Sequence, residues 1–268
     1  MNLSNLFRSL LLSAQLLASI VCSADDHFSE VGLPTSPSDT QILHRKAYSL
    51  SYDPQLRTPR WVMWCLTADH AYGNARRPKY AWHEDTDVST PRATFADYRQ
   101  PNVDKSLKWT KGHLCPAADN KWDETAMYES FLLTNCCPQS AALNSGRWNK
   151  IESDCRAWAR QYGAVYIVSG PLYLKGPHEL IGQNKIAVPE ALYKVVIRLG
   201  ADPCGIAFVC RNTHTSQPRD QYVNTISEVE RLTGITFFPN LPTDIAQIVK
   251  NSADTKRWKS FKKSNEKY

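Results

Sequence analysis

The chain has 268 residues, of which 42% are hydrophobic and 22% charged, a balance typical of an ordinary globular protein. This composition excludes a wholly disordered chain. Beyond residue 23 no stretch approaches the roughly 18 consecutive apolar residues that a spanning helix needs, so we expect no stable membrane insertion. The formal net charge of +6 favours a polyanionic partner, although charge alone is weak support.

The N-terminal segment 1–23 has the pattern of a signal peptide. Arg8 supplies one positive charge, an apolar stretch runs from Leu10 to Cys22, and small residues suited to cleavage lie near Ser23. This pattern predicts export, with the protein either secreted or periplasmic. A mitochondrial presequence is the alternative, which the single arginine favours less.

Cysteine usage leaves two interpretations open. The chain has eight cysteines, at positions 22, 65, 115, 136, 137, 155, 204 and 210. Removal of the expected signal peptide would take Cys22 with it and leave an odd number of cysteines, so at least one cysteine would stay unpaired. Export would permit disulfides, and Cys204 with Cys210 is one plausible pair among many. Structural zinc is the competing interpretation, but the chain contains no CxxC motif.

The segments before residue 140 predict few regular elements. The polar, proline-bearing segment 24–60 is expected to be a loosely structured lead-in. We then expect, in chain order, a strand at 61–66, a charged loop at 73–101, a short segment at 107–114, a helix at 119–130 and a strand at 131–135.

The second half of the chain gives stronger patterns. Ile151, Cys155, Trp158, Ala159 and Tyr162 recur at spacings of three and four, which predicts an amphipathic helix over 145–162 that ends at Gly163. Apolar runs predict strands at 164–169, 191–199 and 205–210, and a further helix at 221–233. We therefore expect one α+β domain over 61–245, built on a central sheet, followed by a basic C-terminal tail at 246–268.

Polar side chains recur at helical spacing near the start of the strongest predicted helix. Steps of four from Asn144 reach Trp148, Glu152 and Arg156, which share one face of a regular helix. The simplest interpretation is an N-capping asparagine and a surface ion pair between Glu152 and Arg156. His113, which follows Gly112, would turn this face into a reactive site only if the fold brings it there.

Several separated motifs resemble the DNA/RNA non-specific endonuclease family, which includes endonuclease G and secreted bacterial sugar-non-specific nucleases. The likeness rests on Trp109-Thr110-Lys111-Gly112-His113-Leu114, on Phe131-Leu132-Leu133-Thr134-Asn135 with Pro138-Gln139, and on the run from Leu143 to Glu152. It extends to Ala96-Asp97-Tyr98, Val168-Ser169-Gly170-Pro171 and Ile186-Ala187-Val188-Pro189, and so covers roughly residues 60 to 240 in consistent order.

The resemblance implies a ββα-metal (His-Me) finger on a mixed α+β core, with the finger formed by strands around His113 and Asn135 and by the 145–162 helix. His113 matches the general base that takes a proton from water. Asn144 matches the single protein ligand of Mg²⁺, with Mn²⁺ as the alternative ion. DNA and RNA are the implied substrates, and a homodimer is an implied assembly.

Further roles follow from the same resemblance. Glu152 matches the carboxylate that holds the water shell of the ion, Arg156 an arginine that neutralises the scissile phosphate, and Asn135 an asparagine that supports the site. Arg77, or equally Arg76, corresponds to a phosphate-binding arginine upstream, although a solvated loop charge is the simpler interpretation of either.

One departure from the family pattern concerns Thr110 and Lys111, which stand where the family usually has Asp-Arg. Lys111 keeps a positive charge but lacks the planar fork of arginine. We expect activity with an altered rate or pH dependence. The alternatives are a catalytically impaired nucleic-acid-binding protein, which would bind in a salt-sensitive way without cleavage, and an unrelated exported protein that does neither.

Overall fold

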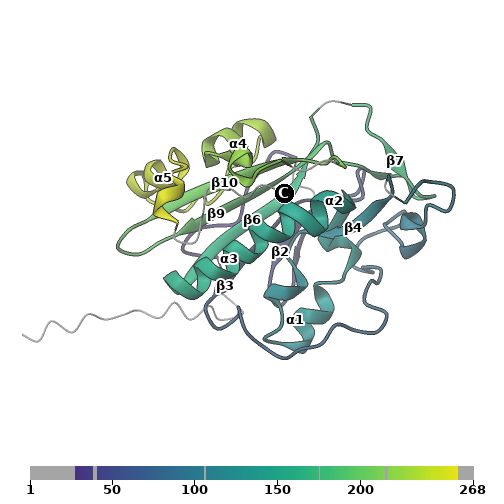
Figure 1. The fold of residues 1–268 in the computed structure, drawn as a ribbon, viewed down its shortest axis with the longest axis horizontal. Helices are drawn as coiled ribbons and strands as arrows, with labels where there is room; N and C mark the ends of the chain where they lie inside the picture. The colour runs from purple at the N-terminus through teal and green to yellow at the C-terminus, as the bar shows by residue number, and fades with distance from the viewer. Residues whose placement is uncertain (1–27, 39–40, 106, 175, 215–216, 259–268) are drawn as a thin grey trace, which may run out of the picture.

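A seven-stranded sheet in the order β1-β2-β3-β6-β9-β10-β11 forms the centre of the fold in the computed structural model (Figure 1). The structure describes residues 28–38, 41–105, 107–174, 176–214 and 217–258, so the expected signal peptide lies outside them. The strands are β1 Gln41–His44, β2 Ser49–Asp53, β3 Thr58–Thr67, β6 Ala164–Leu172, β9 Ala191–Arg198, β10 Cys204–Arg211 and β11 Val223–Asn224. Each adjacent pair is antiparallel.

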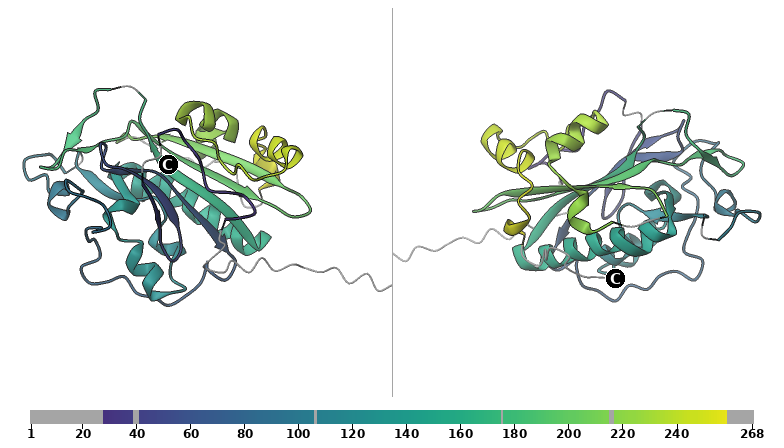
Figure 2. Two further views of the ribbon diagram at one scale, coloured as in Figure 1. Left: turned by 180° about the vertical axis from the view of Figure 1, so that it is seen from behind. Right: turned by 45° about the horizontal axis from the view of Figure 1, so that its top comes forward.

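Helices cover both faces of this sheet (Figure 2). The long helix α3, Asn149–Tyr162, packs over β3 and β6, while α4, Ile226–Thr233, and α5, Thr243–Lys250, pack against β10 from the other side. Strand β9 is buried at every position because both of its faces are covered. The α+β class and the single domain are confirmed, with an antiparallel sheet in place of the mixed one expected.

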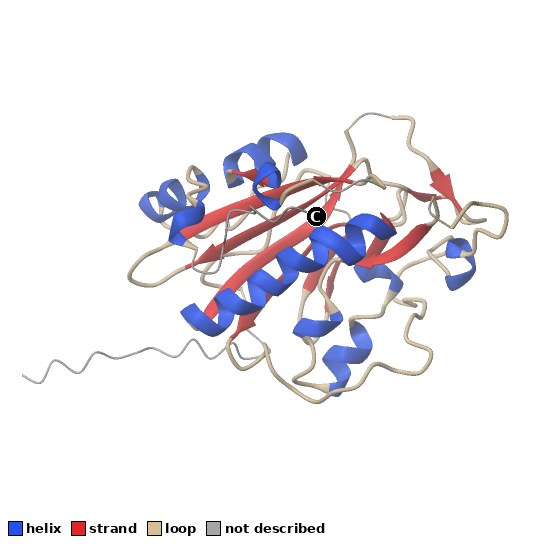
Figure 3. Cartoon of the chain, in the orientation of Figure 1, coloured by secondary structure: helices blue, strands red, loops and turns tan. Residues whose placement is uncertain are grey.

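A smaller unit beside the sheet brings together the candidate site. Strand β4, Trp109–His113, pairs with β5, Cys136–Ser140 (Figure 3). Gly112 is required in β4, because a Cβ there would lie 2.0 Å from Gln139 Oε1. The chain continues directly from β5 through the short helix α2, Ala141–Leu143, and a π-helical turn, Asn144–Trp148, into α3.

The remaining elements are short. They are helix α1, Glu124–Glu129, the strand pair β7, Leu180–Ile181, and β8, Ile186–Ala187, and 3₁₀ turns at Phe95–Tyr98, Ala117–Asp119, Leu133–Asn135, Arg219–Tyr222 and Thr255–Arg257. Among the described residues, none of the helices has the length and apolar character to cross a membrane.

Three expectations about element placement are wrong. The supposed lead-in contains β1 and β2, which are integral to the sheet. The strand expected at 131–135 is a turn, and the strand begins one residue later, at Cys136. The expected tail begins within α5 and includes Trp258, which is 1% exposed and packs on Trp158 at a ring separation of 4.5 Å.

The cysteines also differ from the expectation of disulfides. In the described part of the chain, all seven cysteines are buried, and no disulfide joins any two of them. Cys204 and Cys210 lie on one extended strand, and six steps of a strand separate their Cα atoms by about 20 Å, far beyond the reach of a disulfide. The pair suggested by the sequence is therefore wrong.

Candidate active site

His113 ends β4 inside a group of aromatic rings. Its ring lies 4.3 Å from that of Trp82 and 4.8 Å from that of Phe131, measured between centroids. Nε2 is buried and has no hydrogen-bond partner among the described residues. Burial, and secondly the charge of Arg77, lowers the pKa of His113 from 6.5 to about 3. The imidazole is therefore neutral at pH 7 and can accept a proton.

Asn135 fixes the backbone just beyond His113. Its side chain accepts a hydrogen bond from Cys115 N at 3.0 Å and donates to the carbonyl oxygens of Cys115 and Ser130, each at 2.8 Å. The residue is fully buried, so each of these bonds replaces one with water. Asn135 thus holds the turn that follows β4, and its side chain is committed to backbone groups.

Asn144 lies in the π-helical turn and is not an N-cap. Its φ and ψ are helical, and Ser140 is the residue whose side chain caps the start of the helical segment by accepting from Leu143 N. Asn144 Nδ2 donates to Thr110 Oγ1 on β4 at 3.1 Å. The segment is kinked at Gly146, with φ −98° and ψ −109°, so Asn144 does not follow the regular face of α3. The simpler capping interpretation is therefore wrong.

Glu152 and Arg156 do share a face of α3, but it is not a surface face. Glu152 is 9% exposed. Arg156 donates to Asp119 Oδ1 at 2.9 Å and to Ser153 Oγ at 3.0 Å. The anticipated ion pair between Glu152 and Arg156 is replaced by an ion pair between Arg156 and the buried Asp119.

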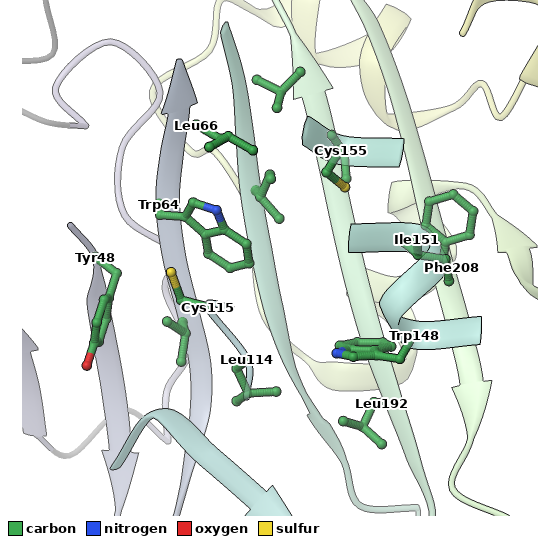
Figure 4. Close-up of a cluster of buried hydrophobic side chains, with 14 of the residues drawn as sticks. Tyr48, Trp64, Leu66, Leu114, Cys115, Trp148, Ile151, Cys155, Leu192 and Phe208 are labelled. Atoms are coloured by element: carbon green, nitrogen blue, oxygen red, sulfur yellow. The ribbon is translucent and has the colours of Figure 1, made fainter. Parts of the chain in front are cut away.

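A buried lysine completes this polar cluster. Lys194 on β9 is fully buried, and its Nζ lies 4.8 Å from the ring of Trp64 and 4.6 Å from that of Trp148. Figure 4 shows both indoles in the layer between the sheet and α3. The ammonium also donates to Leu114 O at 3.4 Å, and Trp148 Nε1 donates to His113 O at 3.4 Å. The cluster is thereby joined to the end of β4.

Burial, and secondly the neighbouring charges, shift the pKa values of the two acids in this cluster. Burial raises the pKa of Glu152 to about 7, with Lys194 and Arg156 lowering it and Asp119 raising it. Burial also raises the pKa of Asp119, against the opposing charge of Arg156. Asp119 and Lys194 were missed from the sequence, where the only signal was a lysine within an otherwise apolar strand.

The remaining candidate residues carry positive charge. Arg77 stacks over Phe131 at 5.2 Å, so it lies beside the His113 ring that Phe131 also contacts. Arg76 and Arg77 line a pocket of about 570 Å³ together with Lys121, and none of the residues lining it is acidic. Lys111 instead lies over the rings of Phe95, at 4.6 Å, and Tyr98, at 5.2 Å.

The donor set fits a hard divalent cation with few protein ligands. The described residues contain no group of three or more His, Cys, Asp or Glu side chains that could hold a metal ion. Asn144 uses its amide nitrogen on Thr110, which leaves its oxygen available. An amide oxygen suits Mg²⁺, which prefers oxygen ligands and keeps much of its water shell.

Comparison with known proteins decides the family. The model of the DNA/RNA non-specific endonuclease family matches residues 25–244. The chain belongs to this family. Similar proteins include the mitochondrial nuclease EXOG of Xenopus laevis, 33% identical over 85% of this chain and 66% of that protein, and the mitochondrial endonuclease G of Bos taurus, 33% identical over 76% and 71%. The chain thus spans about two thirds of the length of these relatives.

A solved structure agrees with this assignment. EndoG in its complex with the inhibitor EndoGI superposes with a TM-score of 0.76 and 27% sequence identity, covering 86% of this chain and 98% of that chain. The family predicted from the motifs is confirmed, and its named relatives support classing the chain among nucleic-acid hydrolases.

Proposed function

We propose that the chain is a magnesium-dependent endonuclease that hydrolyses phosphodiester bonds in DNA and RNA with little sequence preference. The observation that carries this proposal is a neutral, buried His113 with an unpartnered ring nitrogen beside Arg77 and a cationic pocket. Manganese is the alternative ion.

His113 would act as the general base. A ring that is neutral at pH 7 can take a proton from the attacking water, whereas an already protonated ring cannot. The pKa of about 3 describes the protein without substrate. A bound phosphate next to the ring would offset the charge of Arg77 and raise the pKa toward the range in which imidazole is an efficient base.

Asn144 and Glu152 would hold the metal ion. Asn144 would bind it through the amide oxygen, and the buried Glu152 would accept hydrogen bonds from its water shell. When bound, the ion supplies positive charge where negative charge develops on the phosphate and leaving oxygens. Mg²⁺ would need no further protein ligand, because it dehydrates reluctantly and keeps most of its water shell.

Positive side chains would bind the polyanion. Arg76, Arg77 and Lys121 surround a pocket without acidic residues, which suits a phosphate backbone. Contacts to phosphate carry no sequence information, so sequence-independent cutting follows from this lining. Arg156 keeps donors beyond those used on Asp119 and Ser153, and these could reach a phosphate oxygen.

Localisation and assembly are part of the proposal. The relatives named above are mitochondrial by name, which favours the alternative of mitochondrial targeting over secretion or a periplasm. Fusion of residues 1–30 to a fluorescent protein would distinguish the two destinations. A homodimer remains a prediction, to be tested by light scattering coupled to gel filtration.

The deciding experiment is digestion of supercoiled plasmid and of total RNA with Mg²⁺, with EDTA, and by the variant His113→Ala. We expect loss of both substrates only for the wild-type protein with Mg²⁺. His44→Ala is the matched control. His44 forms a hydrogen bond with Ser49 on the edge pair β1-β2, so this variant should cut both substrates normally. Salt-sensitive binding without cleavage by the wild type would instead establish the impaired binding protein.

A further inference from the structure

Thr110, one of the two residues that depart from the family pattern, contacts the proposed metal ligand Asn144. Its side chain is partly buried in β4, opposite Gln139 of β5. The hydroxyl donates to Gln139 O at 2.8 Å and accepts from Asn144 Nδ2 at 3.1 Å. Thr110 therefore connects the two strands of the small unit to the π-helical turn.

The direction of these two bonds selects one orientation of the Asn144 amide. A hydroxyl has one hydrogen, and Thr110 commits it to the carbonyl of Gln139. Toward Asn144 it can only accept, so Asn144 must present nitrogen to Thr110. The amide oxygen is on the opposite branch of the planar group and therefore faces away from Thr110. The flipped amide, nearly identical in shape, would place two oxygens together without a hydrogen between them.

The same contact explains how the chain tolerates the loss of an acid at this position. An ionised aspartate only accepts hydrogen bonds. Thr110 is normally both donor and acceptor, but its proton is used within the strand pair, so what remains for Asn144 is an acceptor like that of a carboxylate. Ser140, the last residue of β5, caps the helical segment that carries Asn144. The cap holds this segment against the strand pair, so the Asn144 amide stays close to the Thr110 hydroxyl.

We propose that Thr110 is a positioning residue that orients the Asn144 amide with its oxygen free for the divalent cation. This inference rests on the proposed function only in taking Asn144 as the metal ligand.

The test compares variants by titrating the substrate-free protein with Mn²⁺ and Mg²⁺ in a calorimeter. Thr110→Val keeps the branched shape and the strand propensity but removes the acceptor. Thr110→Ser keeps the hydroxyl, and Thr110→Asp restores the acid. We expect Thr110→Val to lower the affinity for the metal ion by about 10-fold to 100-fold, the usual effect of losing a partner that orients a ligand. Thr110→Ser and Thr110→Asp should bind the metal ion with an affinity close to that of the wild type or higher.

A double-mutant cycle isolates the orienting role. Asn144→Ala removes the ligand itself, so adding Thr110→Val to it should change the metal affinity no further. Cleavage rates give a second readout: Thr110→Val should need more Mg²⁺ for half-maximal rate but recover most of its rate at saturating Mg²⁺.

Three outcomes would overturn the inference: unchanged metal affinity in Thr110→Val, an equal loss in Thr110→Ser, or a further loss from Thr110→Val in the Asn144→Ala background. Failure of the proposed function has a different signature, which is a wild-type protein that binds the metal with the expected variant pattern but cuts neither DNA nor RNA. The Thr110→Asp variant keeps the test decisive should Thr110→Val not fold.

Discussion

Replacing Arg156 with methionine should destabilise the protein strongly, because it leaves the carboxylate of Asp119 buried without its ion-pair partner. The side chain of Asp119 is 1% exposed and that of Arg156 is 15% exposed, and the two are 2.9 Å apart. Methionine keeps the length of the stem that packs along α3, so the change tests charge more than volume.

The magnitude follows from the burial of the acid. Removing one partner of a buried ion pair typically costs about 3–5 kcal/mol. Trp64 Nε1 donates to Asp119 Oδ2 at 3.1 Å, a bond that the substitution does not remove, and Arg156 itself is not fully buried, so the lower end applies. A loss of about 3 kcal/mol in a protein of this size lowers the melting temperature by about 6–12 °C.

The deficit should also depend on pH. The pKa of Asp119 is already raised by burial, and loss of Arg156 raises it further. Between the unfolded pKa and this raised pKa, the folded variant binds more protons than the unfolded chain, so its stability falls as pH rises through that range. Differential scanning calorimetry at pH 5 and pH 8 should therefore show the larger deficit at pH 8.

Two variants complete the design. Arg160→Met removes an exposed arginine one turn along α3 and should cost less than about 1 kcal/mol. Asp119→Asn combined with Arg156→Met should recover part of the loss, since neither partner then carries a buried charge. A drop of only 1–2 °C for Arg156→Met, with the same value at both pH values, would refute the buried-pair reasoning.

Other regions give further expectations. Because the pKa of His113 is about 3 in the free protein, the acidic limb of kcat/KM at saturating Mg²⁺ should lie well below pH 6.5, and a midpoint at 6.5 or above would contradict the burial argument. Asn135→Ala removes three buried hydrogen bonds and should cost about 2–4 kcal/mol in urea unfolding, whereas a loss under 1 kcal/mol would show that Asn135 does not support the turn. Trp258→Ala should cost about 3–5 kcal/mol if the C-terminal segment packs on Trp158 as described, while a neutral change would restore the idea of a solvated tail.

The elements that the sequence predicted well are those decided by apolar periodicity alone. Helix α3 and strands β3, β6, β9 and β10 agree with the expected segments to within a few residues, because each buries a continuous apolar face. The central layers of the fold could therefore be derived without any resemblance.

The errors occurred where tertiary contacts override local preference. The segment Phe131 to Asn135 has strong strand propensity, yet it turns because the Asn135 side chain takes up backbone groups of Cys115 and Ser130. Strand β5 contains Pro138, which disfavours a strand because proline has no N–H to donate. Among the described residues β5 pairs with β4 alone, and it is buried at all five positions. Neither effect can be read from the neighbouring residues.

The candidate site shows the same division. His113, Asn144 and Glu152 were predicted from the resemblance of their motifs to the family, whereas the contacts that surround them in the structure come from distant segments. Asp119 lies 37 positions from Arg156, and Lys194 comes from the middle of an apolar strand. No helical or strand period connects such residues, so the charge balance around Glu152 could not be predicted.

That charge balance changes which positively charged side chains are expected to attract a polyanion. Lys194 and Arg156 face the acids Asp119 and Glu152, and the pKa of Glu152 near 7 leaves the four groups between neutral and weakly positive at physiological pH. A cluster that is nearly self-compensated attracts a phosphate only weakly. On the proposed function, the long-range attraction for a polyanion would therefore come from cations outside this cluster, such as Arg76, Arg77 and Lys121, which line a pocket without acids. Under the same proposal, Arg156 would act first by keeping Asp119 paired, and any contact that it makes with phosphate would depend on that pairing.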